Sequence, residues 1–463
     1  MTLRPLPLAL LLALSLSACT TLGIHSSYTT PAAQIAPQWQ YAKDAPSGNA
    51  VAVTQAWWQA FGDPALNALI QQSLARNNDL AAATLKLQRA RLQAGLSAEA
   101  LTPTLSGSLG TSTQSSLREQ GSTSRSASAQ LQAAWEIDLW NKLGSQRDAS
   151  NWEAQASAQD RESTALSLSG SMARLYWQQA YLAERIRHSE DSVAYAQRTL
   201  DLVRSKQTAG AASGLDTLQA EQSLASQQAS HTQLIQQRNE ALNSLALLLD
   251  GDAPVAPLPA QLPQSALPAV DAGLPASLLA NRPDLRAAEL RLRSTLATAD
   301  ATRASLYPAL TLTGTLGSSS DTLRHVMENP LGSLASNLSL PFLQWTTTQL
   351  NIKVAQADYD IAVVNFRQTL YTALGDVNNA LSARQQYAAQ AQALQTSLKA
   401  AREIERLYEV RYRAGGATLQ SWLDAQETRR TAENALAENH YNRLSNHVSL
   451  VLALGGSATL DAP

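Results

Sequence analysis

The chain has 463 residues, with 35 Lys and Arg against 37 Asp and Glu, so its formal net charge is only −2. This balance gives no support for nucleic-acid binding or for a polybasic membrane-binding segment, and we expect no nucleic-acid partner. Aromatic residues make up only 5% of the chain while Ala, Leu, Gln and Ser dominate it. Such a composition favours long, closely packed helices over a thick aromatic core.

The N-terminus predicts an exported lipoprotein. A basic start at Arg4 precedes an apolar run at residues 8–16, which is typical of a secretory signal and too short for a permanent membrane helix. Cys19 is the only cysteine, so no intramolecular disulfide can form. Its context, LSAC at 16–19, resembles the lipobox of bacterial lipoproteins. That resemblance implies a signal peptide at 1–18 and acyl chains, N-acyl and S-diacylglycerol, on Cys19; a chance cysteine near an ordinary cleavage site is the alternative.

An internal duplication organises the rest of the chain. Identical residues recur at an offset of 205 positions, as in the following pairs: Leu74 and Leu279, Asp79 and Asp284, Pro103 and Pro308, Trp140 and Trp345, Gly210 and Gly415, Gly251 and Gly456. A constant offset over this distance indicates two copies of one structural unit. The expected parts are an extended segment at 19–63, a first repeat at 64–252, a Pro-rich linker at 253–275, a second repeat at 276–456 and a C-terminal tail at 457–463.

Each copy opens with a helix of about 20 residues, at 79–100 and at 283–305, the second with Pro283 at its N-terminus. The hydrophobic period then changes to two, which predicts two strands of about ten residues in each copy. The expected strands lie at about 103–113, 126–136, 308–318 and 334–343. Their polar faces are built from Ser, Thr, Gln and Asn, which suits a wall between lipid and an uncharged aqueous lumen. A small soluble sheet that caps a helical bundle is the alternative.

A long helical hairpin follows the strands of each copy. In the second copy apolar residues recur at coiled-coil spacing, at Leu350, Val354, Ala357, Ile361 and Val364. Glycine-containing stretches, AGAASG at 209–214 and AGGAT at 414–418, break the helices, and Ser213 and Thr418 are good N-caps for the returning helices. We therefore expect hairpin tips at about 208–214 and 413–418.

Four strands cannot close a membrane barrel, because open sheet edges are not tolerated in hydrocarbon and natural barrels start at about eight strands. A dimer would give a barrel filled by its own side chains, whereas a trimer leaves a channel. The expected fold is mainly α with a membrane β-barrel: a duplicated unit with four strands per chain, whose trimer forms a 12-stranded β-barrel and a 12-helix periplasmic α-barrel.

Several stretches together with the lipobox resemble the outer-membrane factor family of TolC/OprM-like exit ducts, particularly its lipoprotein branch of the NodT and CusC type. They are WWQAFGDPALNALIQQSLARNNDLAAA (57–83), NRPDLRAAE (281–289), ASLYPAL (304–310) and RYRAGGATLQSWLDAQE (411–427). One departure is LPFLQWTTTQ (340–349), where the family often has an Asp-Gly-Gly or Asp-Trp-Gly turn after Phe.

The resemblance implies a homotrimeric efflux duct of the outer membrane in a Gram-negative bacterium. Thr20, rather than Asp, after the acylated cysteine agrees with that membrane. The implied partners are outer-membrane lipid, a periplasmic adaptor (membrane-fusion) protein and an inner-membrane pump of the RND type. The alternative is a lipid-anchored periplasmic coiled-coil scaffold or adaptor.

By the same resemblance, Asp424 and Asp216 narrow the closed periplasmic mouth, with Ser421 and Gln219 at the partner positions. Three copies would group these carboxylates around one axis, which makes such a ring sensitive to pH and cations. The alternative is that both Asp residues only complement the dipole of their own helix.

Other tip residues have two interpretations as well. The tip glycines form the turns and, by resemblance, lie where an adaptor docks: Gly210, Gly214, Gly415 and Gly416. Tyr408 and Tyr412 either hold neighbouring helices together at the mouth or pack one helix flank. The scattered histidines lack an HExxH pattern, and there is no Walker, dinucleotide or GxSxG motif. We therefore expect no enzyme, no metal and no cofactor beyond the lipid on Cys19.

Overall fold

The computed structural model describes residues 23–41, 56–115, 123–270, 272–273, 275–321, 328 and 330–456. These residues form two compact units. The sheet unit takes the described parts of 1–33, 85–159 and 286–369, and the hairpin unit takes those of 34–84, 160–285 and 370–463. No helix in the described part of the chain combines the length and apolar character needed to cross a membrane.

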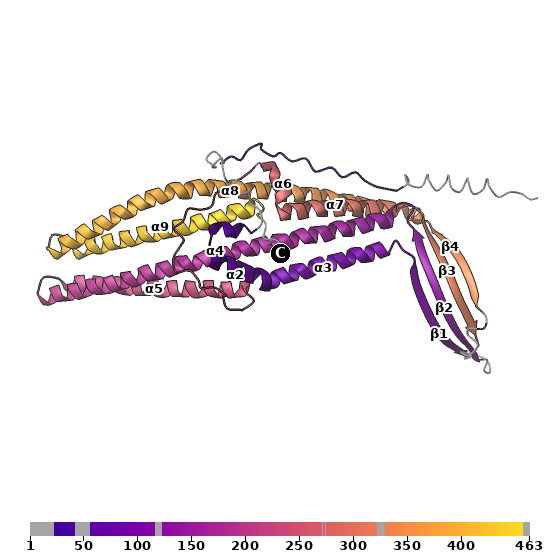
Figure 1. Cartoon of the computed structure of the whole chain (residues 1–463), viewed down its shortest axis with the longest axis horizontal. Helices are drawn as coiled ribbons and strands as arrows, with labels where there is room; N and C mark the ends of the chain where they lie inside the picture. Colours follow the sequence, from indigo (N-terminus) through magenta and orange to yellow (C-terminus); the bar gives the residue numbers. More distant parts are fainter. Residues whose placement is uncertain are drawn as a thin grey trace, which may run out of the picture. The chain divides into compact units, whose positions relative to one another are not determined.

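A four-stranded antiparallel sheet dominates the sheet unit (Figure 1). Its strands, in spatial order, are β1 (Thr104–Ser115), β2 (Thr123–Ile137), β3 (Ala309–Ser320) and β4 (Leu331–Ser339). β1 and β4 each pair with one neighbour only, so each presents an unpaired edge within the described chain. Both outer strands are exposed along their whole length.

The register of the sheet separates apolar from polar side chains. Leu131 of β2 lies opposite Leu316 of β3, and Leu310 lies opposite Leu338 of β4. One residue further along, Gln132 lies opposite both Ser106 and Thr315. Because opposed residues share a face of a sheet, the leucines gather on one face and the hydroxyl and amide side chains on the other.

The fourth strand was expected at about 334–343, and in the structure it begins and ends three to four residues earlier. β4 begins at Leu331 and ends at Ser339, after which Pro341–Gln344 form a 3₁₀ helix, η5. Pro341 has no N–H to donate to a ladder, so it ends the strand. The unusual stretch at 340–349 thus supplies a short helical turn into the next long helix.

Paired helices flank the strands in each copy. Their bounds are α3 (Asn78–Glu99) and α7 (Pro283–Ala304) before β1 and β3, α4 (Lys142–Thr208) and α8 (Trp345–Arg413) after β2 and β4, and the returning α5 (Gly214–Leu248) and α9 (Leu419–Ala453). Shorter elements are η2 (Trp57–Phe61), α2 (Pro64–Arg76), η3 (Pro275–Ser277) and α6 (Leu278–Asn281). α3 and α7 both have 22 residues, and α5 and α9 both have 35. The duplication read from the sequence is therefore also a duplication of structure.

Two helical hairpins form the hairpin unit. Figure 1 shows α5 returning beside α4 and α9 returning beside α8. Leu182 and Ile186 of α4 pack against Leu234 and Ala241 of α5 in the first hairpin. In the second hairpin Leu398 and Ala401 of α8 pack against Ala432 of α9. Small side chains at these contacts allow the helix axes to lie close together.

Candidate functional site at the hairpin tips

Both tips end their long helix with the same glycine turn. Gly210 (φ 74°) and Gly415 (φ 78°) take the left-handed conformation that glycine adopts without strain. Each turn is a Schellman motif, in which two successive N–H groups donate back into the last helical turn. The bonds are Gly210 to Gln207 (2.9 Å), Ala211 to Lys206 (2.8 Å), Gly415 to Tyr412 (3.1 Å) and Gly416 to Arg411 (2.8 Å). Gly214 is the first residue of α5.

Asp216 caps the helix that leaves the first tip. Its Oδ2 accepts hydrogen bonds from the backbone N–H and the hydroxyl of Ser213, both at 2.8 Å, while its own N–H donates to Ser213 Oγ at 3.2 Å. This reciprocal arrangement is a capping box. In the second tip Ser421 takes the corresponding place and donates its N–H to Thr418 Oγ1 at 3.2 Å. Asp216 therefore stabilises the N-terminus of its own helix, which is the alternative to a role in the mouth.

Asp424 differs from Asp216 because it makes no cap. Its side chain is exposed on α9 and accepts a hydrogen bond from Gln420 Nε2 at 2.7 Å, one turn away. No hydrogen bond joins Asp424 to Asp216 among the described residues. Asp424 thus leaves one carboxylate oxygen available to solvent near the tip.

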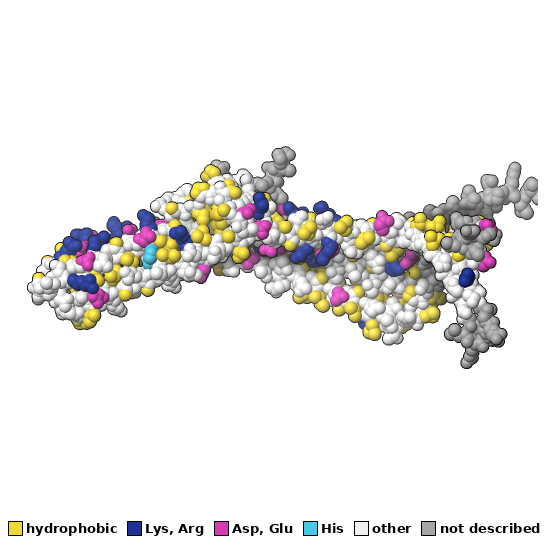
Figure 2. Space-filling model, turned by 90° about the horizontal axis from the view of Figure 1, so that it is seen from below, with side chains coloured by type: hydrophobic (Ala, Val, Ile, Leu, Met, Phe, Trp, Pro, Cys, Tyr) yellow, Lys and Arg dark blue, Asp and Glu magenta, His cyan; other side chains and the backbone are white. Residues whose placement is uncertain are grey.

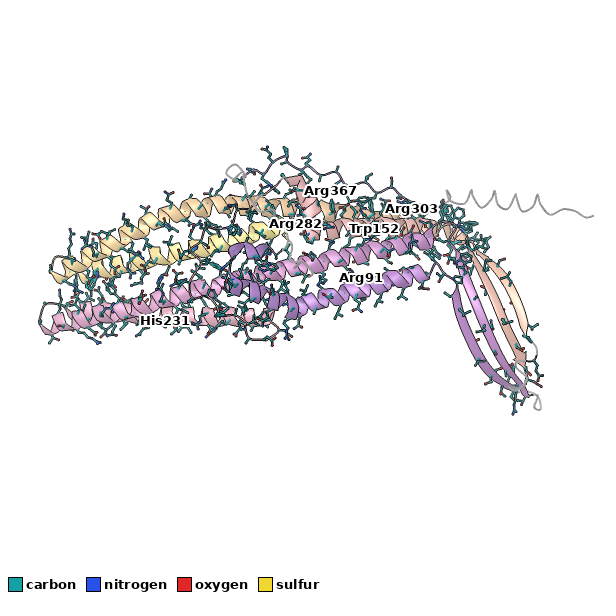
Figure 3. All side chains as sticks on the ribbon, in the orientation of Figure 1. Arg91, Trp152, His231, Arg282, Arg303 and Arg367 are labelled. Atoms are coloured by element: carbon teal, nitrogen blue, oxygen red, sulfur yellow. The ribbon has the colours of Figure 1, made fainter. Side chains whose placement is uncertain are left out.

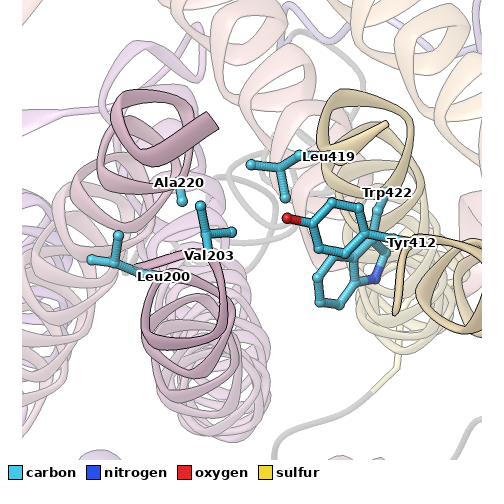
Figure 4. Close-up of a cluster of buried hydrophobic side chains, with 6 residues drawn as sticks. All are labelled: Leu200, Val203, Ala220, Tyr412, Leu419 and Trp422. Atoms are coloured by element: carbon cyan, nitrogen blue, oxygen red, sulfur yellow. The ribbon is translucent and has the colours of Figure 1, made fainter. Parts of the chain in front are cut away.

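A hydrophobic cluster joins the two tips of one chain (Figure 4). We call it the tip cluster; it consists of Leu200, Val203, Ala220, Tyr412, Leu419 and Trp422. The rings of Tyr412 and Trp422 stack at 5.2 Å with an interplanar angle of 28°. Tyr195 of α4 meets Trp422 edge to face at 6.2 Å, and Tyr408 packs against the cluster's margin. Tyr412 is therefore buried between the hairpins, whereas Tyr408 is half-buried.

Polar bonds reinforce this contact between the hairpins. Lys206 Nζ donates to the carbonyl oxygen of Tyr412 at 2.9 Å and lies 4.4 Å from the centre of the Tyr412 ring. Tyr195 Oη donates to Glu409 Oε2 at 3.0 Å. Burial and the nearby charge of Asp216 raise the pKa of the Tyr412 hydroxyl above its usual value. These contacts hold α4 against α8 beside both tips.

A charged network continues from the tip cluster. Glu405 is 7% exposed and pairs with Arg429, which also bonds to Glu433 at 2.6 Å. Arg402 reaches the same Glu433 at 3.0 Å. In Figure 2 basic side chains gather over this end of the hairpins. Because Glu405 and Glu433 are the partners of Arg429 and Arg402, this network ties α8 to α9.

The residues expected at the mouth therefore divide into three groups. Asp216 and Ser421 belong to helix caps, Tyr412 belongs to the tip cluster, and Asp424 is exposed. Three residues of this site were not predicted from the sequence: Tyr195 and Lys206 of α4, and Trp422 of α9. Cys19 lies outside the described residues. No cluster of three or more potential metal ligands occurs in the described ranges.

Comparison with known proteins relates this architecture to outer-membrane export proteins. The family described as outer membrane efflux protein matches residues 69–251 and 274–456, two matches offset by the same 205 residues as the duplication. The chain is 35% identical to the pyoverdine export outer membrane protein OpmQ of Pseudomonas putida, over 98% of this chain and 97% of that protein. It is 30% identical to toxin and drug export protein A of Aggregatibacter actinomycetemcomitans, over 98% of both chains.

Solved structures agree with these relatives. The outer-membrane channel OprN has a TM-score of 0.84 and 27% identity, over 94% of this chain and 99% of that one. CusC, described with transmembrane channel formation, has a TM-score of 0.81 and 25% identity, over 93% and 99%. With matching repeats, matching fold and near-complete coverage, the chain belongs to the outer membrane efflux protein family, whose members are efflux channels of the Gram-negative outer membrane.

Proposed function

We propose that three copies of this chain form a lipid-anchored exit duct with a gated periplasmic mouth. A periplasmic adaptor and an inner-membrane pump of the RND type would supply its substrates. The observation that carries the proposal is the sheet, which has one leucine face, one hydroxyl and amide face, and two unpaired edges.

The sheet suits closure with further copies. In hydrocarbon an unpaired strand edge costs several kcal/mol for each unsatisfied group. The edge of β4 can pair with the edge of β1 from a neighbour, and three chains close a ring of about twelve strands. The exposed leucines, such as Leu109 at 84% and Leu334 at 82%, would face lipid, and the Ser, Thr and Gln face would line water.

The helices of the sheet unit carry complementary apolar stripes. On α3, which leads into β1, Leu85, Leu92 and Leu96 are each about two-thirds exposed, at 64%, 64% and 65%. On α8, which follows β4, the exposed residues are Leu350, Val354, Ile361 and Val364, at 57–61%. Apolar stripes on a surface helix mark a contact with another helix. Chain order places one stripe next to each free sheet edge, so one head-to-tail contact would cover a stripe and an edge together.

The mouth would open by separation of the two hairpins of each chain. The tip cluster and the Lys206 contacts join these hairpins, so they stabilise the closed arrangement. Three copies of exposed Asp424 would add a carboxylate ring at the constriction, while Gly210, Gly214, Gly415 and Gly416 would present the surface for an adaptor. We assign the lipid to Cys19 on its lipobox context.

Charge substitutions on the stripes test the assembly. Leu92→Glu and Ile361→Glu would place charges in the proposed contact, and we expect loss of the heat-modifiable trimer and of single-channel conductance. Gln93→Glu, an exposed residue one step around α3, is the matched control and should assemble normally. Trimers that tolerate both stripe substitutions would contradict this interface. A wild-type protein that never inserts into bilayers would favour the coiled-coil scaffold instead.

A further inference from the structure

The N-terminal segment 23–33, which we call the strap, is clipped to the sheet unit just after the proposed lipid-bearing cysteine. Ile24 donates its N–H to the carbonyl of Trp140 at 3.2 Å, where β2 turns into α4. The backbone is also close there, because a Cβ at Gly23 would lie 3.2 Å from the Cβ of Asn141.

A buried carboxylate forms the centre of the clip. Asp300 of α7 is 2% exposed. It accepts the N–H of Ser26 at 2.7 Å and the Ser26 hydroxyl at 2.6 Å, although 274 residues separate them. Arg303 donates to Asp300 at 2.9 Å and to Ser26 Oγ at 3.0 Å; Figure 3 labels Arg303 on α7. A buried carboxylate is stable only when its oxygens are paired. The two hydrogen bonds from Ser26 of the strap therefore offset much of the cost of burying Asp300.

Contacts of Arg293 with two aromatic rings extend the clip by about two turns of α7. Arg293 lies 4.4 Å from the ring centre of Tyr28 and 5.3 Å from that of Trp152 on α4. The strap is thus held at three alternate residues, Ile24, Ser26 and Tyr28. The side chains between them, Ser27 and Thr29, are exposed.

The duplication shows that this site is not a general feature of the fold. At the same offset the first copy has Gly95 in place of Asp300 and Ala98 in place of Arg303. A Cβ at Gly95 would meet no atom within 4 Å. Only the second repeat carries the carboxylate and the guanidinium that hold a strap.

We propose that this clip fixes the reach of the lipid anchor, so that the acyl chains on Cys19 hold the base of the sheet at the membrane surface while the strands insert. This inference rests on the proposed acylation. Ile24 lies five positions after Cys19, and five residue steps span at most about 17 Å. Without the clip, the next buried contact of the N-terminal segment is that of Trp39, whose Nε1 donates to the carbonyl of Ala272 at 3.0 Å. The tether from Cys19 to that contact can then extend to about 70 Å.

The longer tether should slow insertion. The effective concentration of a tethered partner falls with about the −3/2 power of tether length, so a fourfold longer tether lowers it about eightfold. Asp300 and Arg303 act here as positioning residues through the strap.

The test lengthens the lipid tether in two independent ways and measures the rate at which heat-modifiable trimer forms in pulse-labelled cells. Ser26→Pro/Tyr28→Ala removes the Ser26 and Tyr28 contacts and leaves a single backbone bond, from Ile24, to hold the strap. A 15-residue Gly-Ser insertion after Thr20 instead lengthens the tether and leaves the clip intact. Each should slow trimer formation about eightfold, and their combination only about eighteenfold, because the tether then has 35 residues. Ser27→Pro/Thr29→Ala is the matched control and should keep the wild-type rate.

Every other pattern overturns the inference. If only the clip variant slowed trimer formation, the clip would have a merely structural role. If only the insertion slowed it, the clip would not set the length of the lipid tether. An effect of about 64-fold for the combination would show independent causes. If wild-type trimers incorporate no labelled palmitate, the acylation is wrong while the duct remains; if wild type forms no trimer, the proposed function itself is wrong.

Discussion

Lys206→Met isolates the contact that joins the two hairpins at the mouth. Methionine keeps most of the apolar stem but removes the charge that bonds to the Tyr412 carbonyl at 2.9 Å and lies 4.4 Å from the Tyr412 ring. Hydrogen bonds to charged groups contribute about 1.5–3 kcal/mol, and a partly exposed cation–π contact about 0.5–1 kcal/mol. The Tyr412 carbonyl keeps its bond from Gly415, so we take the lower part of this range, about 2 kcal/mol.

If that free energy favours only the closed mouth, its loss raises the ratio of open to closed channels about 30-fold. The open probability of single purified trimers in a planar bilayer measures this ratio directly. The matched control is Arg204→Met, two residues earlier on α4, because Arg204 pairs with Glu221 of its own hairpin at 2.8 Å. An equal increase in the control, or none in Lys206→Met, would refute the idea that the mouth opens by separating the hairpins.

Three further predictions concern the tips and the core. Asp424→Ala should give a larger or less cation-selective single-channel current, because it removes an exposed carboxylate from each copy; an unchanged current would place Asp424 outside the constriction. Burial lowers the pKa of His447 to about 4, whereas a histidine in the unfolded chain titrates near 6.5. As the pH falls below about 6.5, the unfolded chain therefore binds a proton that the folded chain does not bind. The free energy of unfolding then decreases by about 3 kcal/mol towards pH 4. His447→Leu should lack this part of the loss when denaturant unfolding at pH 7 and 4.5 is compared with wild type. Gly415→Ala should lower stability by about 1–2 kcal/mol because its φ of 78° strains any Cβ, and Gly415→Asn should cost less in the same unfolding assay.

Local signals in the sequence were sufficient for the strands, the long helices and their order. They did not predict α2 at Pro64–Arg76 or the 3₁₀ helix η2 at Trp57–Phe61, which lies in the segment expected to be extended. The switch from period two to helical period located the strands and the long helices. The glycine and Ser or Thr caps located both tips, because such turns depend on a few adjacent residues. The end of β4 was mispredicted since Leu340 and Phe342 continue the alternation beyond Pro341, whose missing N–H decides the outcome.

Contacts between distant helices could not be read in the same way. Tyr412 was expected either to bridge helices or to pack a flank, and the structure buries it against Trp422 between the two hairpins. Its partner Lys206 lies 206 residues away, and nothing in the local sequence around Lys206 indicates that pairing. The clip of Ser26 on Asp300 was missed for the same reason.

The two repeats together indicate where the chain departs from a symmetric wall. A tube built from equivalent hairpins needs similar residues at matched positions, and the glycine turns at 210 and 415 fulfil this condition. Residues at matched positions differ where one copy makes a contact that the other copy does not make. Arg204 and Glu221 bond within the first hairpin, whereas their counterparts Glu409 and Gln426 do not repeat the pair, and Glu409 instead bonds across to Tyr195. Because a contact between hairpins needs complementary groups on its two sides, this asymmetry lies at the joint that the proposed opening of the mouth would break.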